Sequence, residues 1–126
     1  GASTGRPRRV GPIDLVATRY GCRIQGATEV ALTKLDVLSY MKEIPVCTQY
    51  EVNGEKTDDF PFTAVIDKAK PVLTTVPGWG CDISGVRKYE DLPQAARDYV
   101  EYVEQAIGVH ISYVSVGAGR DEIIYR

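Results

Sequence analysis

Histidine, cysteine and long apolar runs are scarce in this chain of 126 residues, and each scarcity excludes a class of protein. The single histidine, His110, leaves little material for a Ser-His or Cys-His nucleophile. The three cysteines, Cys22, Cys47 and Cys81, are odd in number and far apart, which fits neither a disulfide framework nor a zinc site. We expect them to be buried, reduced thiols of a cytoplasmic protein.

The balance of charge is equally undistinctive. Fifteen Lys and Arg face 17 Asp and Glu, and the net charge of −2 draws the chain neither to nucleic acid nor to a membrane. No apolar run approaches the roughly 18 residues of a membrane-spanning helix, and no signal peptide is evident. A hydrophobic fraction of 44% and a charged fraction of 25% are typical of one soluble globular domain. Because the chain lacks an initiating Met and ends directly after an apolar segment, we expect it to be a piece of a longer protein.

Apolar periodicity and turn residues predict alternating helices and strands. Helices are expected over 12–25, 37–41, 63–70 and 91–107, with Pro12 and Asp91 at two starts and Gly26 and Gly108 after two ends. Strands are expected over 29–33, 44–52, from 55 onward, 72–76, 109–116 and 122–125, with Asn53-Gly54 as a hairpin turn. The predicted fold is α/β, with a mixed sheet, flanking helices and a β-hairpin.

Several residues that resemble site residues are expected to be structural or solvated instead. These are Asp14 in the first helix, the pair Asp58-Asp59 in a solvated turn, Trp79 as a packing anchor, His110 near a strand start, and Glu101, Glu104 and Gln105 on the polar face of the 91–107 helix.

The strand over 29–33 runs into a polar tip, Lys34-Leu35-Asp36. Open α/β sheets bind ligands at the carboxyl ends of their strands. A carboxylate accepts two hydrogen bonds side by side, and guanine offers two adjacent donors, N1–H and the exocyclic amine, whereas adenine offers no such pair. Asp36 would therefore select guanine, while the stem of Lys34 would lie along the base. Thr33 takes the Asn place of the Asn-Lys-x-Asp box of GTP-binding proteins. The alternative is a helix-start Asp beside a solvated Lys.

Two further loops have the composition of ligand sites. The segment 3–11 crowds Arg6, Arg8 and Arg9 into one loop, and arginine pairs bidentately with carboxylates and phosphates. A solvated basic arm is the alternative. The segment 115–120, Ser-Val-Gly-Ala-Gly-Arg, follows a strand, and its glycines would let backbone N–H groups approach a base oxygen such as guanine O6. An ordinary surface loop is the alternative there.

In combination these motifs resemble the C-terminal portion of adenylosuccinate synthetase. The resemblance covers the whole chain, 1–126, as a single fragment. It is carried by Ser-Thr-Gly-Arg-Pro-Arg-Arg at 3–9, Ala-Leu-Thr-Lys-Leu-Asp-Val-Leu at 31–38, Pro-Gly-Trp at 77–79, Asp-Leu-Pro at 91–93 and Ser-x-Gly at 115–117.

The resemblance implies part of a P-loop-NTPase-like sheet and a GTP-dependent ligase of AMP biosynthesis. Such an enzyme joins inosine monophosphate (IMP) to L-aspartate and yields adenylosuccinate, GDP and phosphate. GTP is a co-substrate, Mg²⁺ a cofactor, and the family is cytoplasmic and usually homodimeric, with no nucleic-acid or membrane partner implied.

The resemblance also implies a role for each matching position. The aspartate loop would comprise Ala2, Ser3, Thr4, Gly5, Arg6, Pro7 and Arg8. Arg6 would also reach IMP. GTP would be bound by Arg8, Lys34, Leu35, Asp36, Ser115, Val116 and Gly117.

The catalytic residues, the phosphate loop and the magnesium ligands of the family belong to its N-terminal portion, and none of those motifs occurs here. We therefore expect no ligase activity from this piece alone. The chain departs from the family at Gly11-Pro12, where Gly-Trp is common, and at 116–119, where many members have Thr-Gly-Pro-Asp. A stand-alone guanine-nucleotide-binding module and a nucleic-acid-binding domain with an arginine arm are the alternative functions.

Overall fold

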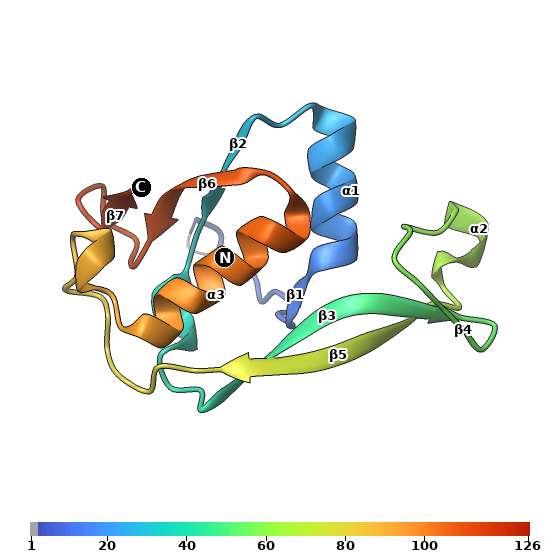
Figure 1. Ribbon diagram of the computed structural model, residues 1–126, viewed down its shortest axis with the longest axis horizontal. Helices are drawn as coiled ribbons and strands as arrows, with labels where there is room; N and C mark the ends of the chain where they lie inside the picture. The colour runs from blue at the N-terminus through green and yellow to red at the C-terminus, as the bar shows by residue number, and fades with distance from the viewer. Residues whose placement is uncertain (1–2) are drawn as a thin grey trace.

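Two β-sheets and two main helices form the part of the chain that the computed structural model describes, residues 3–126 (Figure 1). The first sheet holds β1 (Ile13–Asp14), β3 (Glu43–Val52), β4 (Glu55–Thr57) and β5 (Lys70–Pro77). The second holds β2 (Glu29–Leu32), β6 (His110–Ser115) and β7 (Ile123–Tyr125). Each sheet combines one parallel pair with antiparallel pairing, so the predicted mixed α/β class is confirmed. The described strands form two sheets, however, rather than the one expected.

Helix α1 (Leu15–Gln25) begins later than predicted. Ile13 and Asp14 pair with Val46 and Cys47 as β1, so Pro12 precedes a strand and is not the first helical residue. Asp14 is the N-cap: its Oδ1 accepts a hydrogen bond from the Ala17 N–H at 3.0 Å, and its Oδ2 accepts one from the Tyr50 hydroxyl. The structural role predicted for Asp14 is confirmed, and Gly26 ends the helix at φ 62° as expected.

Helix α3 (Gln94–Ile107) supplies the largest share of the core. The predicted apolar stripe is buried at Leu92, Ala96, Tyr99, Val103 and Ile107. The prediction of Asp91 as the cap is wrong, because that residue lies in the 3-10 helix η2 (Tyr89–Asp91) and Pro93 precedes α3 without a side-chain cap. Gly108, in the left-handed conformation, ends the helix as predicted.

Trp79 is the packing anchor expected. Its ring meets that of Tyr99 edge-on, with centroids 5.9 Å apart, and its indole N–H donates to the Ser39 hydroxyl at 3.1 Å. This contact fastens the segment after β5 to the middle of α3.

The hairpin of β3 and β4, with β5 beside it, extends to one side of α3 (Figure 1). Asn53 and Gly54 form its turn with φ of 52° and 84°, as the sequence predicts. Helix α2 (Thr63–Ile66) is shorter than the expected 63–70, because Lys70 already begins β5. Asp58 and Asp59 lie in an exposed turn, as expected.

The cysteines differ from one another in burial. Cys22 and Cys47 are buried as predicted, but the prediction is wrong for Cys81, which is exposed in the loop after Trp79. Burial, reinforced by the charge of Asp14, raises the pKa of the Cys47 thiol and keeps it protonated. Within the described residues, no helix is long and apolar enough to cross a membrane.

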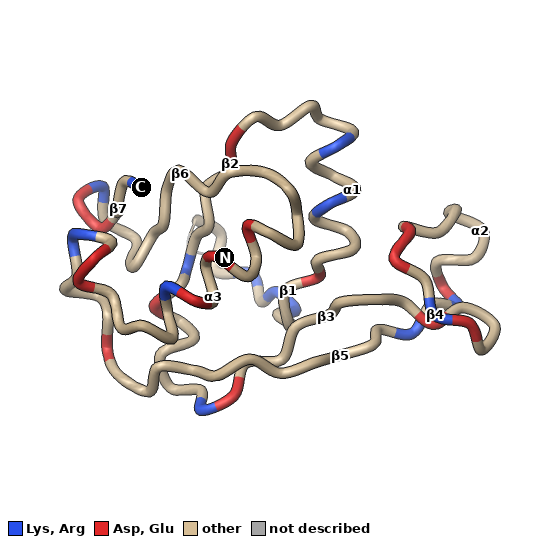
Figure 2. Tube along the Cα trace, in the orientation of Figure 1, with Lys and Arg blue, Asp and Glu red and all other residues tan. Residues whose placement is uncertain are grey.

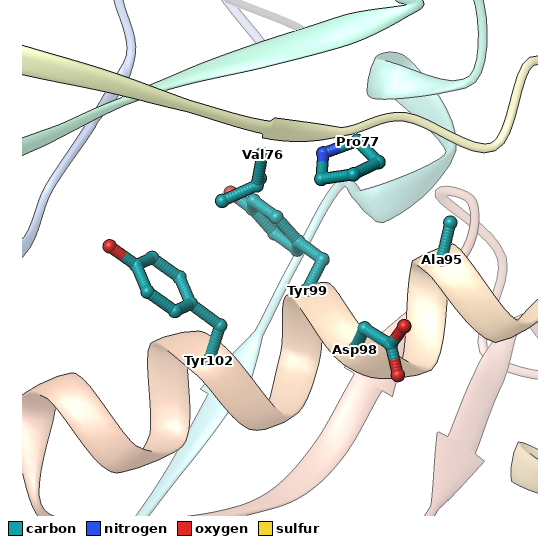
Figure 3. A pocket seen from close by; sticks show the side chains of 6 residues that line it. All are labelled: Val76, Pro77, Ala95, Asp98, Tyr99 and Tyr102. Carbon is teal, nitrogen blue, oxygen red and sulfur yellow. The ribbon is translucent and has the colours of Figure 1, made fainter.

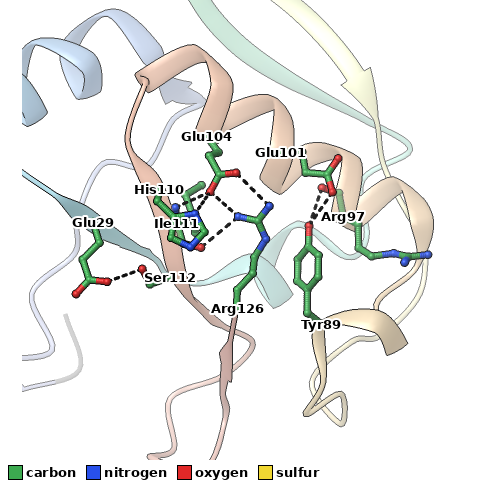
Figure 4. A network of polar contacts seen from close by, with 9 residues as sticks. All are labelled: Glu29, Tyr89, Arg97, Glu101, Glu104, His110, Ile111, Ser112 and Arg126. Atoms are coloured by element: carbon green, nitrogen blue, oxygen red, sulfur yellow. Dashed lines mark hydrogen bonds and ion pairs between the residues drawn. The ribbon is translucent and has the colours of Figure 1, made fainter.

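A half-buried ion pair joins α3 to β6 and to the residue that follows β7 (Figure 4). Glu104 accepts hydrogen bonds from the Arg126 guanidinium and from the Ile111 N–H at 2.7 Å, and its Oε2 lies 2.8 Å from His110 Nδ1. Arg126 also stacks over the Tyr89 ring, 4.8 Å from its centroid. The expectation that Glu104 belongs to a solvated face is therefore wrong. His110 was expected to be either structural or solvated, and it is exposed.

Replacing Glu104 by Gln should lower the free energy of unfolding by about 1–3 kcal/mol near neutral pH, because it removes the charge that Arg126 and Ile111 N–H contact. The hydrogen bond from Arg126 lowers the pKa of Glu104 from 4.5 to about 2. The contribution is therefore fully present above about pH 4.5 and disappears as the pH falls from there toward 2. Urea unfolding of the parent chain and of Glu104→Gln between pH 7 and pH 3 measures this difference. Glu90→Gln, an exposed carboxylate change, is the control, and an equal pH dependence of both variants would contradict the prediction.

Candidate functional site

The parallel pairing of β2 with β6 brings two of the predicted loops together. Leu32 at the end of β2 lies beside Val114 of β6, so the segments that begin at Thr33 and Ser115 leave the sheet at the same edge. This is the carboxyl edge at which α/β sheets bind ligands.

The chain turns sharply after β2. Lys34 adopts the left-handed conformation, with φ 63° and ψ 34°, and leads into the 3-10 helix η1 (Leu35–Leu38). That conformation costs a non-glycine residue about 1 kcal/mol, so the surrounding structure must hold it. Leu35, 1% exposed, supplies the anchor beneath the turn, and the Val37 N–H donates to the Lys34 carbonyl at 3.2 Å. The helix predicted over 37–41 thus begins two residues earlier and is of the 3-10 type.

Hydrogen bonds between its own residues and to Glu122 fix the shape of the loop after β6. The Ser115 hydroxyl donates to the Gly117 carbonyl at 2.7 Å. Val116 is fully buried, and its N–H donates to the Glu122 carbonyl at 2.9 Å. Val116 is therefore not among the residues that line the cavity beside this loop, whereas Gly117 and Ala118 face the space between the two loops.

A cavity of about 500 Å³ separates the tip from the loop. Its lining comes entirely from these two strand ends and consists of Thr33, Lys34, Asp36, Val37, Ser115, Gly117 and Ala118. Sequence reasoning named Thr33 only as the residue in the Asn place of the Asn-Lys-x-Asp box, and it gave Val37 and Ala118 no binding role. Their adjacency to Lys34, Asp36 and Gly117 was the available signal.

The carboxylate of Asp36 is the chemically distinctive group in this cavity. Its Oδ1 is buried and has no hydrogen-bond partner in the described chain. Buried polar atoms are nearly always paired, and leaving one unpaired costs about 1–3 kcal/mol. A carboxylate can only accept, so the missing partner is a donor. The arrangement thus suits a ligand that presents an N–H edge to Asp36, with Lys34 at the rim to cover its face.

The arginine loop is not part of this cavity. Gly5 turns it at φ 64°, and the Thr4 hydroxyl accepts a hydrogen bond from the Arg6 N–H at 3.4 Å. Arg6 and Arg8 lie in an exposed segment, and the predicted position Ala2 is outside the described residues. Lys and Arg are interspersed with Asp and Glu along the whole trace (Figure 2), which does not favour the nucleic-acid alternative.

A second cavity, of about 220 Å³, lies between α3 and β5 (Figure 3). Apolar side chains dominate its lining, and Tyr99 reaches from α3 toward Val76 and Pro77 of β5. Its one carboxylate, Asp98, already accepts a hydrogen bond from Gln94 Nε2 at 2.6 Å. This cavity offers no unpaired polar group comparable with that of Asp36. Among residues 3–126, no group of three or more His, Cys, Asp or Glu is placed to hold a metal ion.

The fold and the cavity together define an α/β protein with a ligand site at the carboxyl edge of a parallel strand pair. The family model of adenylosuccinate synthetase matches residues 1–124. The chain therefore belongs to the adenylosuccinate synthetase family, and the resemblance seen in the sequence is confirmed.

Individual relatives agree with the family match. The adenylosuccinate synthetase of Mycobacterium sp. (strain KMS) is 48% identical and covers 100% of this chain. That of Mycobacterium tuberculosis (strain ATCC 25618 / H37Rv) is 49% identical with the same coverage. A fully ligated adenylosuccinate synthetase from Plasmodium falciparum superposes on 100% of this chain with a TM-score of 0.92 at 31% identity. The chain spans 30% of the first of these proteins, 29% of the second and 31% of the third.

Leu35→Ala should destabilise the chain by about 2–4 kcal/mol, because it leaves a cavity beneath the strained turn at Lys34. Urea unfolding followed by circular dichroism measures the loss. Leu73→Ala in β5, where the side chain is 51% exposed, is the matched control and should cost less than 1 kcal/mol. Equal losses from the two variants would show that Leu35 is not the anchor of the tip.

Proposed function

We propose that residues 1–126 form the C-terminal region of a GTP-dependent ligase that joins IMP and L-aspartate to give adenylosuccinate, GDP and phosphate, a step of AMP biosynthesis. The observation that carries the guanine-binding part is the buried, unpaired carboxylate oxygen of Asp36 in a cavity between two strand ends. Membership of the family supports the rest. In the whole protein the two sheets described here would belong to one P-loop-NTPase-like sheet of a cytoplasmic homodimer.

The proposed guanine contacts follow from the cavity lining. Asp36 accepts hydrogen bonds from N1–H and the exocyclic amine of guanine, and the stem of Lys34 covers the base. The segment 115–117 closes the opposite side, with backbone groups toward the base oxygen. Leu35, 1% exposed and outside the cavity lining, contributes by holding the turn that carries Lys34 and Asp36.

The reaction proposed for the whole protein has two steps. The γ-phosphate of GTP is transferred to the 6-oxygen of IMP, and the aspartate amine then displaces that phosphate. Arg6 binds aspartate and the IMP ribose, and Arg8 binds aspartate and the GTP phosphates. A planar guanidinium pairs bidentately with the carboxylate and phosphate anions and also donates to the neutral ribose oxygens. The remaining positions of this aspartate loop are 2–5 and Pro7. Positive charge near the phosphates stabilises the charge that develops during transfer.

Magnesium is proposed to accompany GTP and to neutralise its phosphate charge. The described residues supply no ligand cluster for it, so its ligands are expected outside this segment, as are the catalytic residues. The proposed contribution of this chain is to bind and orient the guanine base and aspartate, and we expect no ligase activity from it in isolation.

Asp36→Asn should lower kcat/KM for GTP by at least about 100-fold. The substitution replaces one of the two acceptor oxygens of Asp36 with an amide donor, which would then face a donor of guanine. Xanthosine triphosphate, whose 2-oxo group accepts, should become the better substrate. The measurement uses a chimera in which residues 1–126 replace the matching 29% of the Mycobacterium tuberculosis relative. Adenylosuccinate formation is followed with GTP, ATP and xanthosine triphosphate.

Asp58→Asn, in an exposed turn of the first sheet, is the control for this substitution and should leave GTP use unchanged. A chimera that uses GTP equally well with Asn at position 36 would remove Asp36 from the guanine site. A folded parent chimera with no activity on any of the three nucleotides would overturn the ligase assignment.

Arg6→Ala in the same chimera should raise the aspartate KM and lower kcat together, each by about 10-fold or more, since the guanidinium contacts both substrate and reaction centre. Initial rates at varied aspartate and saturating GTP and IMP measure both constants. Arg23→Ala on α1, also an exposed arginine, controls for the loss of charge. An unchanged aspartate KM in the Arg6 variant would exclude it from the aspartate site.

A further inference from the structure

We infer that Glu122 is a positioning residue for guanine-nucleotide binding, because it holds the loop over 115–119 in the shape that closes the cavity opposite Asp36. The inference rests on the proposed function and adds to it a residue outside the cavity lining. Glu122 lies just before β7, and no motif in the sequence points to it.

Glu122 contacts the loop at three points. Its carbonyl accepts a hydrogen bond from the Val116 N–H at 2.9 Å, and its own N–H donates to the Gly119 carbonyl at 3.1 Å. Its carboxylate Oε2 accepts from the Gly119 N–H. The two backbone bonds are available to any residue at 122 except proline, whereas the third depends on the side chain.

The same carboxylate occupies the space beside Gly117. A Cβ added to Gly117 would lie 2.3 Å from Glu122 Oε2 and 2.4 Å from Cδ, well inside van der Waals contact. Gly117 has no left-handed φ, so a side chain at this position is opposed by the Glu122 carboxylate and not by the backbone conformation, and the carboxylate would have to turn away to admit it. The Glu122 carboxylate can therefore take its observed position only because residue 117 has no side chain.

This fit has a consequence for the cavity. Ser115, Gly117 and Ala118 form its wall on the β6 side, and Asp36 lies on the β2 side. The Glu122 carboxylate bonds to the loop directly after that wall, at Gly119. Loss of the carboxylate would let 117–119 relax and change the separation of the two sides, on which the fit of a planar base depends. The predicted kinetic signature is weaker nucleotide binding with little change in the chemical step.

The test uses the chimera with the Mycobacterium tuberculosis relative and the KM of each substrate. Glu122→Ala should raise the KM for GTP about 10-fold, the cost of losing one hydrogen bond to a charged group. The kcat and the KM values for IMP and aspartate should stay within about 2-fold of the parent. Glu122→Gln, which keeps an acceptor of the same size, should recover most of the affinity for GTP. Glu55→Ala in β4 is the control for removing an exposed carboxylate.

A double-mutant cycle tests the fit between the two residues. Gly117→Ala alone should raise the KM for GTP, because its methyl group collides with the carboxylate. In the Glu122→Ala background the same change should add little, since the space is then free. Additive effects of the two changes would contradict the fit.

The outcomes separate the inference from the function on which it rests. A folded parent chimera that neither turns over nor binds GTP overturns both. A parent that uses GTP, together with a Glu122→Ala variant of unchanged KM for GTP, overturns the inference alone. So does a Glu122→Ala variant that loses kcat at constant KM, because that pattern reports fewer folded molecules rather than a reshaped cavity.

Discussion

Parallel pairing of β2 with β6 is the interaction on which the candidate site depends. It sets Leu32 beside Val114, and the described residues that line the cavity either end or follow one of these two strands. A slip of one residue would turn the side chains of β2 to the opposite face of the sheet. The core opposes such a slip, because Val30 and Leu32 of β2 pack against the buried cluster to which Ile111 and Val114 of β6 belong.

Local signals in the sequence were sufficient for much of the fold. Asn53-Gly54 requires positive φ at two successive positions, and Gly26 and Gly108 end helices in the left-handed conformation, so each marks its own turn. The stripe from Leu92 to Ile107 follows the period of a helix with one buried face. The polar tip at Lys34–Asp36 and the loop at 115–117 were recognisable because each directly follows a strand, and family motifs reinforced both.

Features that depend on distant partners were not readable in the same way. The position of Glu104 in the helix places it on the polar face, opposite the apolar stripe. Only the fold reveals that Arg126 and the Ile111 N–H donate hydrogen bonds to it. Asp14 pairs with Tyr50 across the sheet, and Ile13 joins a strand because β3 lies beside it, which delays the start of α1. The division into two sheets likewise follows from strand pairing. The sequence also did not reveal that the arginine loop, residues 3–11, lies apart from the cavity and supplies none of the residues that line it.

The order of the strands along the chain also bears on how this segment folds. β3, β4 and β5 are neighbours in sequence and can pair early, because closing short loops costs little entropy. The two strands that carry the cavity, β2 and β6, are far apart in the sequence, because β3, β4, β5 and α3 all lie between them. Contacts of such high sequence separation form late and slow the folding of a domain. A nascent chain can therefore form the cavity only after α3 and β6 have both been synthesised.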